Sequence, residues 1–104
     1  IVAVPFPFTE GEAEKRRPAL IVSTGALAKD YNLYWLVMIT SAKNRQWPCD
    51  IAVKNSAKAG LPAPSVIRPA KIATLQEDKM LRRLGVLPEE ERKAVRQAMK
   101  EFLA

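Results

Sequence analysis

The stretch Leu33-Tyr34-Trp35-Leu36-Val37-Met38-Ile39-Thr40 is apolar at every position except the last. It is the longest apolar run in the chain of 104 residues. A short, unbroken run of aromatic and branched side chains is typical of a β-strand that is covered on both faces. The run is also far too short to cross a bilayer. The stretch therefore predicts a buried strand and gives no indication of a membrane segment.

Two strand patterns precede this run. Residues 1–8 are rich in strand formers, but Pro5 and Pro7 cannot donate backbone hydrogen bonds to a neighbouring strand. We therefore expect an edge strand there, or a strand that leaves the sheet. Residues 18–24 predict a second strand, because the backbone before Pro18 favours extended geometry and Gly25 ends the apolar run.

Three further strand patterns and one helix pattern follow the run. Polar and apolar residues alternate over residues 50–54 and, less regularly, over residues 70–75, while residues 65–67 form a short strand-like segment. Over residues 88–103 the apolar residues recur every four positions, Pro88 suits the first helical position, and the first turn is rich in glutamate. This last pattern predicts a C-terminal amphipathic helix of about four turns.

These patterns together predict an α+β fold that is mainly β. Five or six short strands linked by loops form a small, strongly curved antiparallel sheet or barrel, and the C-terminal α-helix packs on it. The length of the chain is typical of one domain, so we expect a single domain spanning residues 1–104.

The composition restricts the chemistry that the chain can perform. It contains no histidine and a single cysteine, Cys49, so the usual general bases, nucleophiles and metal-ligand sets are missing. We therefore expect no metal and no cofactor, and chemistry that depends on arginine, hydroxyl groups and a carboxylate. Because a lone cysteine cannot form an internal disulfide, the composition favours a cytoplasmic location.

The positive charge is concentrated in the middle of the chain. The formal net charge is +6, and residues 40–75 carry +5 of it, with six Lys or Arg residues and one acid, Asp50. Such a field favours a polyanionic partner, with nucleic acid first and an acidic protein segment second. A solvated basic face that only aids solubility is an equally good reading of the charge alone.

Two residues are the strongest candidates for chemistry on a phosphate. Arg17 stands immediately before Pro18 and a rigid strand, so its planar guanidinium loses little freedom when it meets an anion. Its alternative role is a surface ion pair with Glu12 or Glu14. Thr40 ends the buried run, where its hydroxyl and that of Ser41 reach the loop. The alternative for Thr40 is a local hydrogen bond to the backbone.

The loop over residues 41–48 mixes cations, amides and an indole, which suits single-stranded nucleic acid. Trp47 either stacks on a base or covers one end of a small barrel. Arg68 precedes Pro69 in the same way that Arg17 precedes Pro18, and it completes an anion site if the fold brings the two arginines together. We expect the pair Arg82-Arg83 to form a solvated turn first and a nucleic-acid contact second.

Four segments, in this order and spacing, resemble the MazF/PemK toxins of bacterial toxin-antitoxin pairs. They are Val4-Pro5-Phe6-Pro7-Phe8, Lys15-Arg16-Arg17-Pro18-Ala19-Leu20-Ile21-Val22-Ser23, Ile39-Thr40-Ser41 and Gly60-Leu61-Pro62-Ala63-Pro64-Ser65-Val66-Ile67-Arg68-Pro69. The resemblance implies an SH3-like barrel, a homodimer, a cognate antitoxin with an acidic tail, and metal-independent cleavage of single-stranded RNA by the ribose 2′-hydroxyl. The excess of apolar residues in so small a chain also favours the dimer.

The resemblance also assigns roles to individual residues. Arg17 and Thr40 match the family's catalytic arginine and its hydroxyl partner, and Glu12, Ser41 and Arg68 match supporting positions. The residues that we expect to bind RNA are Lys15, Arg16, Lys43, Arg45, Trp47, Arg68 and Lys71. Relatives often carry an aspartate where this chain has Ala70. That difference keeps open an inactive relative, or a toxin that binds a protein as the similarly folded CcdB toxins do.

Overall fold

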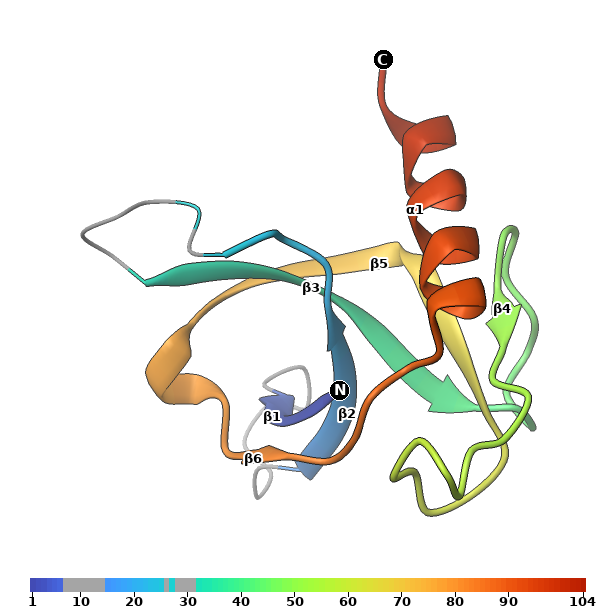
Figure 1. Ribbon diagram of the computed structural model, residues 1–104, viewed down its shortest axis with the longest axis horizontal. Coiled ribbons are helices and arrows are strands. Elements are labelled where there is room, and N and C mark those ends of the chain that lie inside the picture. The colour runs from blue at the N-terminus through green and yellow to red at the C-terminus, as the bar shows by residue number, and fades with distance from the viewer. Residues whose placement is uncertain (7–14, 26, 28–31) are drawn as a thin grey trace.

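The computed structural model describes residues 1–6, 15–25, 27 and 32–104. Figure 1 shows the strands of a curved sheet and a helix that stands against one end of it. The elements are β1 (Val2–Phe6), β2 (Lys15–Ile21), β3 (Leu33–Ser41), β4 (Ile51–Ala52), β5 (Ser65–Gln76), a short 3₁₀ helix η1 (Glu77–Lys79), β6 (Arg82–Arg83) and α1 (Glu89–Phe102). Within these residues no helix is long and apolar enough to span a membrane.

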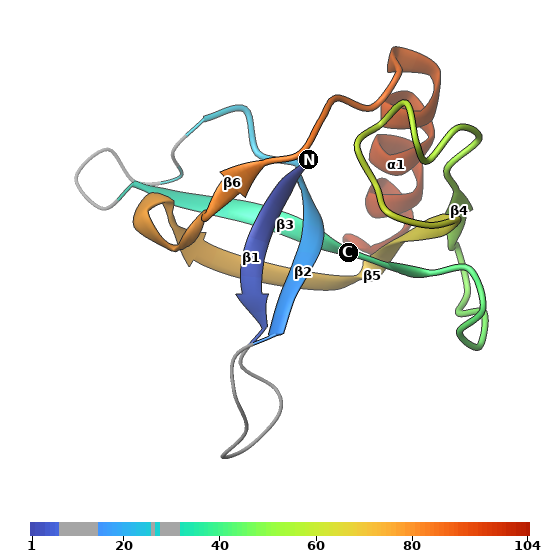
Figure 2. The same ribbon diagram turned by 90° about the horizontal axis from the view of Figure 1, so that it is seen from below.

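The strands form one antiparallel sheet in the order β4-β5-β3-β2-β1-β6. The predicted mainly β fold with a C-terminal helix is thereby confirmed. β3, the apolar run of the sequence, lies between β2 and β5. In Figure 2, β1 and β2 run side by side and β6 lies beside the start of β1. The closure of this sheet into a barrel stays a prediction, because the described ladders end at β4 and β6.

Strand alternation divides the core between the two faces of the sheet. One face, the Met38 face, buries Val4, Ala19, Leu36 and Met38. The opposite face, the Ile39 face, buries Leu20, Val37, Ile39 and Ile67, and on it also pack Leu87 and Val95, the latter from α1. Since successive side chains of a strand point to opposite faces, any other residue of β1, β2 or β3 can be assigned to a face by its position.

β5 contains a bulge that turns the strand. Val37 of β3 pairs with Ile72, but its neighbour Met38 pairs with Arg68, so the intervening residues of β5 have no partner on β3. Those residues are 69–71 and include Pro69, which has no backbone donor. Bulges bend a strand, and Figure 1 shows β5 changing direction beside α1. The segments 65–67 and 70–75, predicted as two strands, are therefore one strand with a corner.

The other boundaries differ from prediction in ways that backbone pairing explains. β2 starts at Lys15, ahead of Pro18, because its first residues pair with β1. The prediction of a turn at Arg82-Arg83 is wrong: these residues form β6 and pair with Ala3 and Val2. β6 pairs with Val2 and Ala3 of β1 and does not reach Pro5. Pro5, which has no backbone N–H, is therefore not required to donate a hydrogen bond to β6. Pro88 is the residue before α1 and not its first helical residue.

Two glycines permit a close crossing of the backbone. A Cβ atom at Gly60 would lie 1.9 Å from the carbonyl oxygen of Leu84, and one at Gly85 would lie 2.0 Å from that of Ala59. Gly60 also has φ +86°, a conformation that other residues rarely adopt. The loop over residues 57–62 therefore sits directly on the segment that leaves β6.

Candidate functional site

Arg17 and Thr40 belong to neighbouring strands and to the same face of the sheet. The β2–β3 ladder pairs Ala19 with Met38. Two residues further along each antiparallel strand are Arg17 and Thr40, so they lie at the same level, past the last pair of the ladder. Both share the Met38 face by alternation, and both are half-buried. The two residues expected from the sequence to act together therefore occupy one end of one face.

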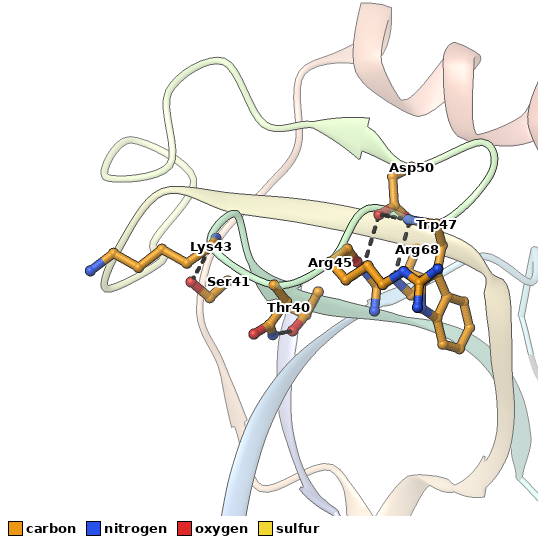
Figure 3. Close-up of polar contacts among 8 residues, drawn as sticks. Thr40, Ser41, Lys43, Arg45, Trp47, Asp50 and Arg68 are labelled. Carbon is orange, nitrogen blue, oxygen red and sulfur yellow. Dashed lines mark hydrogen bonds and ion pairs between the residues drawn. The ribbon is translucent and has the colours of Figure 1, made fainter.

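The hydroxyl groups at the end of β3 organise the loop that follows. The hydroxyl oxygen of Thr40 accepts a hydrogen bond from the side-chain amide of Asn44. The hydroxyl oxygen of Ser41 accepts one from the backbone N–H of Lys43 at 3.2 Å. A hydroxyl that accepts a bond keeps its own proton for donation. Thr40 can therefore donate to a bound anion while Asn44 holds its oxygen, an arrangement that can be followed in Figure 3.

Arg68 is buried and paired with a carboxylate that the sequence analysis did not assign to the site. Its Nε and Nη2 atoms donate to the two carboxylate oxygens of Asp50 at 3.1 and 3.0 Å. Nη2 also donates to the backbone oxygen of Arg45 at 2.7 Å. The side chains of Arg68 and Asp50 are only 9% and 2% exposed. This two-point pair is the strong geometry for arginine and carboxylate, and it joins β5 to the loop after β3.

Trp47 covers the Arg68 guanidinium. The guanidinium carbon of Arg68 lies 4.4 Å from the centre of the Trp47 ring, and Lys71 Nζ lies 5.9 Å from it. The backbone N–H of Trp47 donates to Asp50 at 2.9 Å, so the same carboxylate holds both residues (Figure 3). Trp47 as a whole residue remains 38% exposed. Trp47 is thus fixed by its loop and by Arg68, with part of its surface left open.

The remaining expected residues have different surroundings. Lys43 and Arg45 are exposed in the loop after β3, and Figure 3 shows Lys43 extending away from the Asp50–Arg68 pair. Arg16 is exposed and lies, by alternation, on the face opposite Arg17. Glu12 and the side chain of Lys15 lie outside the described residues. Ala70 is exposed within the bulge of β5.

The residue that sequence reasoning missed is Asp50. Its signal was its isolation, since it is the one acid among six cations in residues 40–75. An acid retained in a basic segment is well placed to pair with a buried cation, and here it holds Arg68. The pair also removes one of the six positive charges from the surface field.

The arrangement is suited to binding an anion. Among the described residues, no group of three or more His, Cys, Asp or Glu side chains is placed to hold a metal ion. Arg17, the Thr40 hydroxyl and the neighbouring cations offer donors and positive charge, which are the groups that bind phosphate.

Comparison with known proteins agrees with this architecture. The chain matches the family model of PemK-like, MazF-like toxins of type II toxin-antitoxin systems over residues 1–103. No curated protein matches it. The solved structure of the Mycobacterium tuberculosis toxin MazF-mt6 is 21% identical, with a TM-score of 0.75 over 97% of this chain and 92% of that one.

Two other solved structures share the fold at similar identity. A MazE-MazF complex (Form-II) from Deinococcus radiodurans is 23% identical, with a TM-score of 0.71 over 99% of this chain and 91% of that one. An endoribonuclease in complex with its cognate antitoxin, from a mycobacterial species, is 21% identical, with a TM-score of 0.70 over 96% and 88%. From the family match over almost its whole length, this chain belongs to the PemK-like, MazF-like toxins of type II toxin-antitoxin systems.

Proposed function

We propose that this protein is an endoribonuclease toxin that cleaves single-stranded RNA, chiefly mRNA, at selected sequences and without a metal ion. The observation that supports this most is the position of Arg17 and Thr40 at one level of one face, past the last β2–β3 pair. The basic loop after β3 borders the same end of the sheet. A cognate antitoxin, a homodimeric state and a cytoplasmic location belong to the same proposal.

The proposed reaction is an internal transfer at one phosphodiester. The ribose 2′-oxygen forms a bond to phosphorus and loses its proton, while the bond from phosphorus to the 5′-oxygen breaks and that oxygen gains a proton. The products are a 2′,3′-cyclic phosphate and a 5′-hydroxyl. Arg17 stabilises the negative charge that builds up on the phosphate oxygens. It is a poor general base, because a guanidinium stays protonated at neutral pH.

The other residues divide between binding and support. The Thr40 hydroxyl donates a hydrogen bond to a phosphate oxygen, and the hydrogen bond from Asn44 fixes the orientation of that hydroxyl. Lys43, Arg45 and Lys71 attract the RNA backbone, and Trp47 offers its exposed surface to a base. Arg68 contacts the RNA in this proposal, but its main role is to hold the loop after β3 through its ion pair with Asp50.

The test is cleavage of a mixed-sequence, single-stranded RNA with EDTA present. The wild type is expected to yield 2′,3′-cyclic phosphate and 5′-hydroxyl ends, and R17Q to lose about 10²- to 10³-fold in kcat. R96Q is the matched control, because Arg96 is an exposed arginine of α1 that pairs with Glu89. Equal activity of R17Q and R96Q, or no cleavage by the wild type, would contradict the proposal.

A second candidate function is supported by Ala70. It places a methyl group in the β5 bulge where relatives often carry an aspartate, so an acid is missing at this corner. A protein without cleavage activity would act by binding a protein target or by binding RNA alone. Growth arrest that persists in R17Q without any RNA product would favour this function over cleavage.

A further inference from the structure

An open pocket lies where β1, β2 and β6 meet the loop over residues 57–62. Its volume is about 570 Å³. The residues that line it are Ala3, Arg16, Arg17, Pro18, Ala57, Gly60, Leu61, Pro62, Arg82 and Leu84. Of these described lining residues three are arginines and none is an acid, so the described walls combine positive charge with apolar surface.

The sheet register brings Arg82 toward Arg16. Arg82 pairs with Ala3, and Ala3 pairs with Pro18 on its other side. Residues directly opposite each other in an antiparallel ladder share a face, and Arg16 shares the face of Pro18 because it stands two residues away. The two side chains therefore rise from the same face, with Arg82 opposite Ala3 on one side of β1 and Arg16 opposite Pro5 on the other. Nothing in the sequence links them, since they are 66 positions apart.

Arg16 and Arg82 differ from the arginines that pair with acids. Arg68 is neutralised by Asp50, and Arg92 and Arg96 both pair with Glu89. Within the part of the chain that the structure describes, neither Arg16 nor Arg82 forms an ion pair, and both are exposed. Two cations that line one pocket repel each other, and an anion between them relieves that repulsion.

The walls of the pocket are held by backbone contact. The crossing of Gly60 and Gly85 fixes the loop over residues 57–62 against the segment after β6. Leu61 of that loop is buried in the core of the Ile39 face. A ligand therefore meets a largely preformed cavity, which lowers the entropy cost of binding.

The pocket adjoins the proposed cleavage site. The described β2–β3 ladder does not extend from Ala19 toward Lys15, so this end of β2 has an open edge. Arg17 lines the pocket at that edge and belongs by alternation to the Met38 face. A strand of RNA held at Arg17 can thus pass around the edge of β2 and reach Arg16 and Arg82.

We propose that this pocket binds a phosphate of the RNA substrate outside the cleaved linkage, with Arg82 and Arg16 as its donors. The proposal rests on the proposed function. Arg82 is then a binding residue that sets affinity and favours substrates long enough to reach the pocket, while Arg17 acts at the reacting phosphate. An acidic protein segment is the alternative ligand that the experiment must separate from RNA.

The test compares R82Q with R83Q, using a long single-stranded RNA and a shortened one that contains the cleavage sequence. Arg83 is the matched control, because it is the next residue of β6 and lines a different pocket with Arg92. For the long RNA, R82Q is expected to raise KM about three- to tenfold at unchanged kcat. The slope of log KM against log salt concentration should fall by about 0.7, the value for one phosphate contact on a single strand.

The other measurements decide between the outcomes. R83Q should have the KM of the wild type, and R16Q should raise KM as R82Q does. With the shortened RNA, R82Q and R83Q should have the same KM. Equal effects of R82Q and R83Q, or a loss confined to neutralisation by the antitoxin, would overturn the proposal. If the wild type does not cleave RNA, the proposed endoribonuclease function is contradicted, but the pocket can still be tested by the fluorescence anisotropy of a labelled RNA. Weaker RNA binding by R82Q than by R83Q would then support the phosphate pocket, and equal binding would refute it.

Discussion

The Asp50 carboxylate connects Arg68 to the loop that carries Trp47. Its two carboxylate oxygens accept bonds from Arg68 and from the backbone of Trp47, and both charged side chains are withdrawn from water. A buried pair gains little over an apolar pair, because desolvation offsets the attraction. Removing one partner alone is costly, since the other charge stays buried without compensation.

We expect Asp50→Asn to lower the free energy of unfolding by about 3–5 kcal/mol, because Arg68 loses its counter-charge. Urea denaturation measures this directly. Glu77→Gln is the control, since Glu77 is an exposed acid elsewhere in the chain. The double variant Asp50→Asn/Arg68→Met should recover part of the loss. If D50N and E77Q unfold at the same urea concentration, the pair contributes little to stability.

At the scale of elements, the sequence correctly predicted the strands and the helix that are specified by a local pattern of apolar residues. The apolar run predicted β3 almost to the residue, and the four-residue period predicted α1 within one residue at each end. β6 was missed because two consecutive arginines have no strand pattern, and their pairing depends on the backbone of β1. The Asp50–Arg68 pair was missed for a related reason: it forms only when the β5 corner brings Arg68 under the loop.

The Gly60–Gly85 crossing is the element whose geometry tolerates least change. Gly85→Ala tests the steric clash alone, Gly25→Ala tests positive φ alone because nothing lies within 4 Å of its Cβ, and Gly60→Ala combines both. We expect Gly60→Ala to cost about 3 kcal/mol of stability, more than either of the others. Thermal unfolding of the three variants gives the order. Gly60→Ala as stable as Gly25→Ala would show that the backbones can separate without cost.

At the scale of the whole molecule, large apolar side chains remain at the surface. Trp35 and Ile72 are 45% and 50% exposed on the Ile39 face, and Phe102 and Leu103 at the end of α1 are 49% and 73% exposed. Exposed apolar area of this kind is common at interfaces between protein chains. It is consistent with the homodimer that the family resemblance implies.

We expect sedimentation equilibrium to give a mass near twice 11.6 kDa at micromolar concentration. Trp35→Ser should shift the equilibrium toward the monomer if its ring is part of the interface, and Trp47→Ser is the control because Trp47 lies at the proposed RNA site. A wild-type mass of one chain at these concentrations would exclude a stable dimer.

The corner of β5 has a consequence for how the chain can change in length. The bulge holds three residues, so Ile67 before it and Ile72 after it both face the same side as Val37 and Ile39. Ile67 and Ile72 are five positions apart, an odd number that strict alternation would send to opposite sides, so the three unpaired residues take up the odd step. Deleting one residue at the corner would leave an even spacing of four, for which alternation alone keeps both isoleucines on one side. We therefore expect such a deletion to change the bend of β5 and not the side that Ile72 faces.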